Sequence, residues 1–576
     1  MALPRYPSEY MEMTDNVAGE ASKNSNTQGR LARDLGHRPG KSDGVVFRED
    51  SYMPGDNGKY DFFPRAQNRH KSLPPLPLVY MSSSNRPEKL YDYDSSGAST
   101  PRPSPDPPYH VFSKNEKWMV IVIIGAAGLF SGLSSNIYFP SLDAIAQDLK
   151  VSLNMVSLTI TSYLIIQGIS PLLWGSISDV LGRRPIYIAS FAVYIVANIA
   201  LSFSPSFAIL LVFRGLQAAG SASTVSIVRN FSIAVGPVLG GLLSNYFGFR
   251  SIFVFLLIIS TITLAVIITF LPETMRSIAG NGSIRLDGMY RPLVRYVRGD
   301  PEYVEQGSVK SSPRKKVTFM TFVEPLRLLI QKDILINLVF GGIIYAIWSM
   351  VTSSTTGLFK ESFGLNELQI GLCYLPNGLG TIVGSTIVGK LMNKDFAAAE
   401  AAYKSARNEP SKKKLSSKDV PADFPIERAR LQRLPWAVVI FVITTAGYGF
   451  SMAYPSITSL GGWIAVPLVL QFFIAATSNA VFALNQTLVS DLCPGKGASA
   501  TAINNLVRCS LGAVGVAFVE QMIALAGVGP TFLGLALITV SVTPLAVIHW
   551  NWGQQWRAER MMAKEVADEE NAKSKN

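Results

Sequence analysis

An arginine inside an apolar segment stands out among the residues of this chain that could carry chemistry. Arg214 lies within residues 207–228, in the stretch Arg214-Gly-Leu-Gln217-Ala-Ala-Gly220. A charged side chain in a segment that crosses a bilayer is costly and by default marks a functional position. We therefore treat Arg214 as a functional residue, with structural pairing near a helix end as the alternative.

One carboxylate, Glu520, lies well inside an apolar segment. A group that takes up a proton on one side of a membrane and releases it on the other must be titratable and buried. Glu520 is the acid that this role needs. The alternative is that it lies half-exposed near the outer membrane surface.

Glycines, a carboxylate and two arginines follow one another closely between two apolar segments. The sequence reads Trp174-Gly-Ser-Ile-Ser-Asp-Val-Leu-Gly-Arg-Arg-Pro185. A helix ends, the chain turns on glycine and a new helix begins, so the carboxylate and arginines can pair with each other or with neighbouring helix ends. A bare basic turn is the alternative; the residues of this motif are Gly175, Asp179, Gly182, Arg183 and Arg184.

A second glycine motif, Gly236-Pro237-Val-Leu-Gly240-Gly241, lies inside a later apolar segment. Proline removes a backbone donor, and glycine lets a neighbouring backbone approach closely. The motif therefore predicts tight helix packing.

Uncommon polar and aromatic side chains within the apolar segments suggest a substrate cavity. Aromatic walls with a few hydrogen-bonding groups suit amphipathic or cationic organic molecules, although each residue alone is more often a helix-packing or interfacial residue. Arg508 could instead pair with a helix end or attract an anionic substrate. The candidates are Asn136, Tyr138, Tyr163, Gln167, Gln217, Tyr345, Trp348, Asn377, Gln471, Asn479, Asn485 and Arg508.

The composition indicates which elements hold these residues. The 576 residues are 48% apolar and 16% charged, whereas a soluble domain is about 25% charged. Outside four polar stretches, the remaining 330 residues include only 17 Lys, Arg, Asp and Glu residues. A soluble fold could not cover its surface with so few. We therefore predict an all-α membrane protein and exclude a soluble enzyme, a disulfide scaffold and a fully disordered chain.

Twelve apolar segments approach the roughly 20 residues that a helix needs to cross a bilayer. They lie near 118–138, 155–175, 185–203, 207–228, 230–247, 251–271, 334–354, 369–391, 435–455, 463–489, 502–526 and 530–552. The chain then divides into a disordered cytoplasmic tail 1–117, a six-helix bundle 118–271, a cytoplasmic central loop 272–333, a six-helix bundle 334–552 with a cytoplasmic insertion 392–434, and a cytoplasmic C-terminal tail 553–576.

Loop charge predicts the orientation. One side carries the Arg183/Arg184 turn, the loops 272–333 and 392–434, and Lys496; the other carries only Lys150, Arg250 and Lys360. Basic loops stay cytoplasmic, so both termini are expected there. The net charge of +12 is then orientation charge and not a nucleic-acid surface. We expect a monomer in the lipid bilayer, in the plasma membrane.

Taken in order, the motifs resemble those of the major facilitator superfamily. Residues 175–184 resemble its G-x-x-x-D-x-x-G-R-R/K signature, Arg214 with Gln217 its R-x-x-Q-G motif, and residues 236–241 its G-P-x-x-G-G antiporter motif. The resemblance implies two six-helix bundles (6+6), gating by the first motif, a part in proton coupling for Arg214 and export for the third motif. The stretches TSYLIIQGISPLLWGSISDVLGRRP and FPIERARLQRLP are similar to fungal twelve-spanner drug:proton antiporters, in the quinidine-resistance, dityrosine and polyamine exporter branch.

The two halves should be repeats, yet one place is short. From Gln471 to Arg508 there are 37 positions, and from Arg214 to Arg229 only 15, so about 22 residues are absent around the junction of helices four and five. A single fused span is the alternative, but it would put the basic loops outside. The shortening is either a genuine variant or a gene-model or splicing artefact.

These observations predict a proton-coupled exporter of small organic molecules or drugs that works by alternating access, with substrate and protons as its small partners. An importer or facilitator of a nutrient or organic acid, and a transport-deficient paralogue, are the alternatives. We expect no enzyme, metal or cofactor, because four histidines and the cysteines Cys373, Cys493 and Cys509 form no ligand or nucleophile spacing.

Overall fold

A computed structural model describes residues 110–221, 229–282, 284–299, 318–407, 415 and 420–573. Helices and no strands occur in these ranges, which confirms the all-α prediction. The first half contains the long helices α2 (Lys114–Asn136), α4 (Leu153–Leu181), α5 (Arg183–Ser202), α6 (Phe207–Ser221), α7 (Arg229–Phe247) and α8 (Arg250–Phe270). The second half contains α12 (Lys332–Phe363), α14 (Leu375–Ala406), α16 (Leu434–Ser451), α18 (Ala465–Leu492), α19 (Gly497–Ala526) and α20 (Val528–Lys573).

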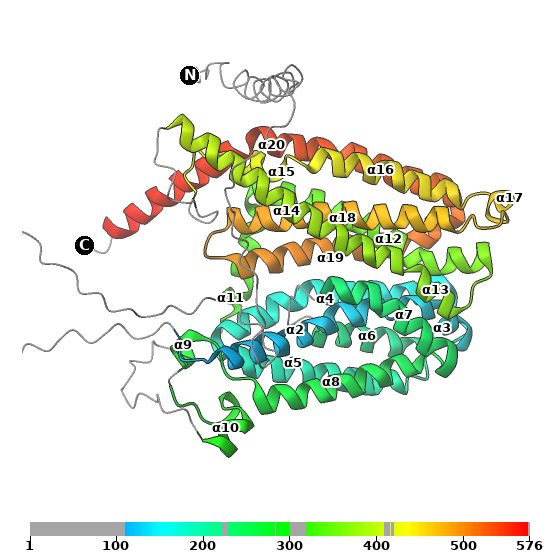
Figure 1. The fold of residues 1–576 in the computed structure, drawn as a ribbon, viewed down its shortest axis with the longest axis horizontal. Helices are drawn as coiled ribbons and strands as arrows, with labels where there is room; N and C mark the ends of the chain where they lie inside the picture. The colour runs from blue at the N-terminus through cyan, green and yellow to red at the C-terminus, as the bar shows by residue number, and fades with distance from the viewer. Residues whose placement is uncertain are drawn as a thin grey trace, which may run out of the picture. The chain divides into compact units, whose positions relative to one another are not determined.

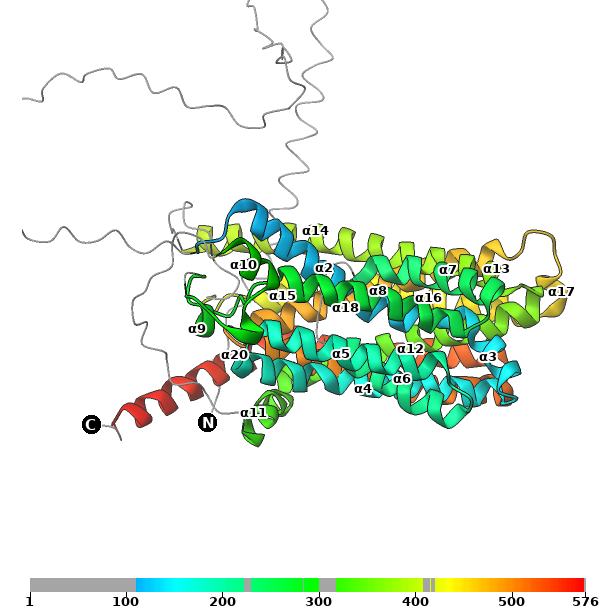
Figure 2. The same ribbon diagram turned by 90° about the horizontal axis from the view of Figure 1, so that it is seen from below.

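Short helices connect the long ones. They are η1 (Phe139–Ser141), α3 (Leu142–Asp148), α9 (Arg276–Ala279), η2 (Gly288–Tyr290), α10 (Leu293–Arg298), α11 (Phe319–Val323), η3 (Glu324–Ile330), α13 (Glu367–Cys373), α15 (Ile426–Leu431) and α17 (Pro455–Thr458). Figure 1 shows α3, α13 and α17 at one end of the long helices and α9, α10 and α11 at the other, and Figure 2 shows the same separation. We name these the outer and inner ends, after the orientation that the loop charges predict.

Local sequence sets where these helices begin and end. At the start of α2, the Ser113 side chain accepts from the backbone of Glu116, whose carboxylate accepts from the backbone of Ser113. At the end of α4, Gly182 has φ of +98°, a conformation that favours glycine. Helix α12 likewise ends at Gly364 with φ of +63°.

Among the described residues, nine helical segments are long and apolar enough to cross a membrane. Helices α6, α7 and α14 do not meet both criteria, but each lies at a position where a span was predicted. The two halves of the chain pack against each other chiefly where α4 meets α19 and where α7 meets α13 and α14.

Two predicted polar regions begin with helix. The insertion 392–434 is helical as far as Ala406, because α14 continues beyond the apolar segment without a break. The C-terminal tail 553–576 is helical through Lys573, because α20 extends past the predicted span. Both extensions lie at the inner end, so the second half of the chain has a helical inner surface where loops were expected (Figure 1).

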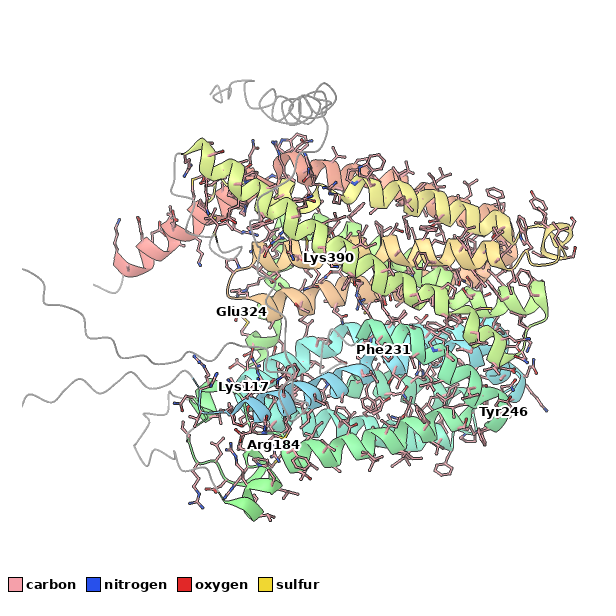
Figure 3. The ribbon with its side chains drawn as sticks, viewed as in Figure 1. Lys117, Arg184, Phe231, Tyr246, Glu324 and Lys390 are labelled. Carbon is pink, nitrogen blue, oxygen red and sulfur yellow. The ribbon has the colours of Figure 1, made fainter. Side chains whose placement is uncertain are left out.

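The structure describes predicted spans four and five on either side of their junction. The described part of helix α6 has 15 residues, and that of helix α7 has 19. Figure 3 shows Phe231 of α7 between Lys117 at the inner end and Tyr246 at the outer end. Residues 222–228 lie outside the described residues.

Contacts of the last described residues of α6 and the first of α7 lie partway along the neighbouring helices. Gly220, at the end of α6, packs against Tyr194 in the middle of α5. Asn230, at the start of α7, donates to Ser385 Oγ at 3.2 Å, ten residues into the 32-residue α14.

Candidate functional site

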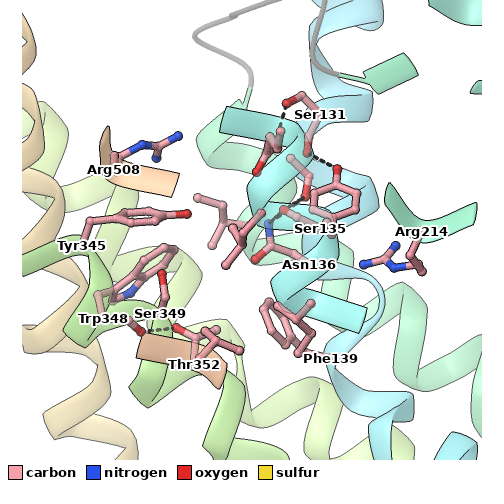
Figure 4. A pocket seen from close by; sticks show the side chains of 17 residues that line it. Ser131, Ser135, Asn136, Phe139, Arg214, Tyr345, Trp348, Ser349, Thr352 and Arg508 are labelled. Carbon is pink, nitrogen blue, oxygen red and sulfur yellow. Dashed lines mark hydrogen bonds between the residues drawn. The ribbon is translucent and has the colours of Figure 1, made fainter. Parts of the chain in front are cut away.

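A cavity of about 620 Å³, including the space open to solvent, lies between the two halves of the chain. Helices α2, α4, α6 and α7 line one side, and α12 and α19 line the other. Figure 4 shows Arg508, Tyr345 and Trp348 on one side and Asn136 and Arg214 on the opposite side. The wall is formed by Ser131, Gly132, Ser135, Asn136, Phe139, Ile160, Tyr163, Leu164, Gln167, Arg214, Ile233, Tyr345, Trp348, Ser349, Thr352, Arg508 and Val516.

Arg214 lies at the cavity wall and is 1% exposed. Its guanidinium carbon lies 4.1 Å from the ring centre of Tyr138 and 4.5 Å from that of Tyr163, so the cation is held between two aromatic faces. Its Nη1 donates to Gln217 Oε1 at 2.6 Å and to the Ser134 carbonyl at 3.2 Å. The buried Nε has no hydrogen-bond partner.

Arg508 on α19 has a similar environment and is 3% exposed. Its guanidinium carbon lies 4.3 Å from the ring centre of Tyr345 and 4.9 Å from that of Phe482. Its Nη2 donates to Asn505 Oδ1 at 2.5 Å, and its Nε is also buried without a hydrogen-bond partner. Asn505 in turn donates to the Gln167 carbonyl at 2.7 Å and so joins α19 to α4.

No carboxylate balances these two cations. The residues that line the cavity include no Asp or Glu. The ion pairs of the described residues include neither Arg214 nor Arg508. The cavity wall therefore carries two buried positive charges held by neutral groups. This disfavours a cationic ligand, which the aromatic residues alone had suggested.

The predicted cavity residues separate into two groups. The cavity wall contains Asn136, Tyr163, Gln167, Tyr345, Trp348 and Arg508. Tyr138 and Gln217 support Arg214, and Asn377 accepts from Trp348 Nε1 at 3.0 Å. The cavity wall does not include Gln471, Asn479 or Asn485, whose side chains are buried between helices. Sequence reasoning missed the serines of α2 and α12, because serine in an apolar segment is not an unusual residue.

The gating motif is built around a carboxylate that was absent from the prediction. Glu273, just after α8, is 2% exposed and accepts from the backbone N–H groups of Arg183 and Arg184, each at 3.1 Å. It thus binds the N-terminus of α5, where the helix dipole favours an anion. The Arg184 side chain donates to the carbonyls of Leu271 and Ile268, both at 2.7 Å.

Asp179 of the same motif is exposed, and no ion pair of the described residues includes it. Of the two predicted arrangements, the arginines therefore contact a neighbouring helix end and not Asp179. A Pro-Glu-Thr sequence directly after an apolar segment was the signal for Glu273. Gly182 is required here, because a Cβ would lie 2.6 Å from Glu273 Oε2.

The second glycine motif forms close helix contacts, as predicted. A Cβ on Gly240 would lie 1.8 Å from the Ile137 carbonyl oxygen, and one on Gly241 would lie 2.4 Å from that of Glu367. The motif thus brings α7 against both the end of α2 and the start of α13. This contact joins the two halves of the chain at the outer end.

Further bonds join the halves at the outer end. Lys360 of α12 is paired with Asp143 of α3, which also accepts from Gln147 at 2.6 Å. Thr356 Oγ1 donates to the Phe139 carbonyl at 2.8 Å. We call the pair Asp143–Lys360 and the bond Thr356–Phe139 the outer lock.

Glu520, the predicted proton site, lies away from the cavity wall. It is 12 residues beyond Arg508 on α19, about 18 Å along the helix toward the outer end. Its Oε1 is buried without a hydrogen-bond partner. Glu520 therefore lies nearer the outer end than the cavity does, and it does not line the cavity.

The chain is similar to several known membrane transporters. The family model described as Major Facilitator Superfamily matches residues 124–230 and 223–516. Citrate exporter 1 of Aspergillus niger is 43% identical over 500 residues, which covers 81% of this chain and 94% of the relative. Multidrug transporter QDR2 of Candida glabrata is 30% identical over 486 residues, which covers 76% of this chain and 81% of the relative. The crystal structure of the human organic anion transporter MFSD10 (TETRAN) is 17% identical with a TM-score of 0.44 and covers 75% of this chain and 100% of that chain.

The comparisons also bear on the short junction. The two family matches overlap at residues 223–230, where the sequence is shorter than its counterpart in the second half. Since 81% of 576 residues is about 467, about 33 of the 500 positions aligned with Citrate exporter 1 have no residue of this chain opposite them.

Proposed function

Since this chain belongs to the major facilitator superfamily, we propose that it is a secondary active exporter of small organic anions, in particular compounds with two or more carboxylates. The solute binds in the central cavity from the inner side and leaves on the outer side by alternating access. The substrate class is narrower than the organic molecules or drugs that the aromatic residues suggested.

The observation that carries this proposal is the pair of unbalanced guanidinium groups, Arg214 and Arg508, on opposite sides of one cavity. Burying a cation without a counter-ion is costly. A carboxylate of the solute relieves that cost when it accepts from the guanidinium, and guanidinium groups bind carboxylates with two parallel hydrogen bonds. Each arginine has a buried Nε free for such a bond. A solute with two carboxylates can engage both.

Export is supported by two further points. The glycine motif at residues 236–241 resembles the antiporter motif, and the relative with 43% identity is named for citrate export. Outward movement of an anion is favoured by a membrane potential that is negative inside, by about 2.3 kcal/mol per charge per 100 mV. We propose that proton entry adds to this driving force, with Glu520 as the proton site.

The proposal includes a location and an assembly state. We place the chain in the plasma membrane as a monomer with both termini in the cytoplasm, on the basis of the loop charges. An epitope tag at each terminus that becomes reactive only after permeabilisation supports this orientation. Reactivity of either tag in intact cells contradicts it.

Accumulation of labelled citrate in cells lacking endogenous exporters tests the proposed function. Cells that express the chain should retain less citrate than cells with an empty vector, and a proton uncoupler should raise their retention. Equal retention of citrate together with reduced retention of a cationic drug would favour multidrug export, the activity for which QDR2 is named. Increased citrate uptake would indicate the importer.

A further inference from the structure

A chain of hydrogen bonds lies behind Arg214, on the side away from the cavity. The Gln217 Oε1 accepts from Arg214, and the Gln217 Nε2 donates to Asn198 Oδ1 at 2.7 Å. The Asn198 Nδ2 donates to the Tyr194 carbonyl at 2.7 Å. Both amides are fully buried. Because each N–H group has a partner further along, the chain has one direction, and Gln217 presents its oxygen to the guanidinium.

Among the described residues, the groups that contact this guanidinium are all uncharged. They are the Gln217 amide, the Ser134 carbonyl and the rings of Tyr138 and Tyr163. A carboxylate in place of the amide would lie within the same 2.6 Å contact and would form a charge-assisted pair with the arginine. In a buried site such a pair would largely cancel the positive charge that reaches the cavity. Glutamine and glutamate have nearly the same shape, so this difference comes from charge alone.

We propose that Gln217 is a specificity-determining residue that positions Arg214 and, because it is an amide, leaves the arginine charge free to bind an anionic solute. The proposal rests on the proposed function and deepens it. It assigns the preference for anions to a residue that does not line the cavity.

The test is citrate binding by purified protein in detergent, measured by isothermal titration calorimetry. Gln217→Glu is compared with Gln217→Met, which is similar in size and lacks charge. Gln471→Glu is the matched control, because Gln471 is 3% exposed and its amide bonds only to Thr355 and Tyr448, with no arginine. Asn198→Asp is a second charged variant, one side chain further from the guanidinium.

We expect Gln217→Glu to raise the citrate Kd at least tenfold and Asn198→Asp to raise it less. Gln217→Met should change the Kd by less than about threefold, since the arginine keeps its charge. Gln471→Glu should lower the amount of folded protein without changing the citrate Kd of the folded fraction. The increase in citrate Kd caused by Gln217→Glu should also become smaller at a pH low enough to protonate the new carboxyl.

Two results would overturn the inference. Equal losses of citrate affinity in Gln217→Glu and Gln217→Met would show a structural role without charge selection. If Gln217→Glu does not fold, an unchanged Kd in Asn198→Asp is decisive in the same way. Failure of the proposed function is distinguishable, because the unmodified protein would then bind spermidine and not citrate.

Discussion

At the scale of single residues, charge balance decides how this cavity can be used. Arg214 and Arg508 are buried against aromatic rings, whereas the other buried arginines of the second half are paired with carboxylates. In the proposed function, the bound solute supplies the counter-charge. The sequence predicted Arg214 as functional and left Arg508 open between structural pairing and anion binding. Their common cavity, which no local pattern reveals, favours anion binding.

Arg214→Ala should reduce citrate export while surface expression stays intact. Loss of a hydrogen bond to a charged group costs about 1.5–3 kcal/mol, so the KM should rise about tenfold to a hundredfold. Arg214→Lys should retain part of the affinity, because it keeps the charge but loses the planar fork. Unchanged citrate export by Arg214→Ala at equal expression would refute the assigned role.

Glu520→Gln separates proton coupling from solute binding. Because Glu520 lies about 18 Å along α19 from Arg508, the citrate Kd should be unchanged. Export should lose its dependence on the pH gradient and keep its dependence on membrane potential. Export measured in vesicles with imposed pH and potential gradients gives both quantities. A pH dependence equal to that of the unmodified chain would remove Glu520 from the mechanism.

At the scale of elements, periodicity and motif spacing predicted most of the helices. The order of twelve long helices follows from apolar length, and Gly240 marks a close helix contact as expected. The inner extensions of α14 and α20 could not be predicted from hydropathy, because tertiary ion pairs stabilise them. The role of Glu273 could not be predicted from the sequence, because it depends on the N-terminus of α5, which lies about 90 residues earlier in the chain.

The buried ion pairs at the inner end of the second half should stabilise the fold. Arg557 of α20 pairs with Glu427 at 2.7 Å, and both side chains are at most 6% exposed. Breaking a buried pair leaves an unbalanced charge and costs about 3–5 kcal/mol. Arg557→Ala should therefore lower the temperature at which the detergent-purified protein aggregates.

Arg407→Ala is the control for this measurement, since Arg407 and Asp423 are each 48% exposed. An exposed pair contributes about 1 kcal/mol or less. Equal decreases in aggregation temperature in the two variants would mean that the buried pair stabilises the fold no more than the exposed pair does.

The 15 positions from Arg214 to Arg229, against 37 from Gln471 to Arg508, predict a defect that a longer junction would correct. Insertion, after Ile227, of the segment by which the Aspergillus niger relative exceeds this chain should extend both helices beside α5 and α14. Export per molecule at the surface should then increase. Sequencing the transcript across codons 227–229 decides the origin of the gap: extra codons indicate an omission, and an uninterrupted frame indicates a genuine variant.

At the scale of the whole molecule, the two halves meet at the outer end through the outer lock. Under the proposed alternating access the outer end opens, and we expect the pair Asp143–Lys360 to break in each cycle. The matched pair Asp148–Arg250, at 2.9 Å, lies at the same end but within the first half. Variants at the two pairs can therefore distinguish a role in gating from a role in local stability.

Asp143→Asn should favour the outward-open state, and Asp148→Asn should not. The measurement is the labelling rate of a Ser349→Cys reporter in the cavity by an impermeant maleimide added outside. Native thiols should contribute little, because Cys373, Cys493 and Cys509 are buried and burial raises the pKa of the Cys493 thiol. We expect labelling several-fold faster with Asp143→Asn. Equal rates in the two variants would show that the pair does not hold the outer end closed.

The sign of the charge moved by the transporter tests the central claim most directly. Purified protein in vesicles on a solid-supported membrane should give a current of anionic sign when a citrate gradient is applied. The current should disappear in the double variant Arg214→Gln/Arg508→Gln, and a spermidine gradient should give none. A spermidine current without a citrate current, or a citrate current that survives in the double variant, would contradict an anion exporter that binds its solute between these two arginines.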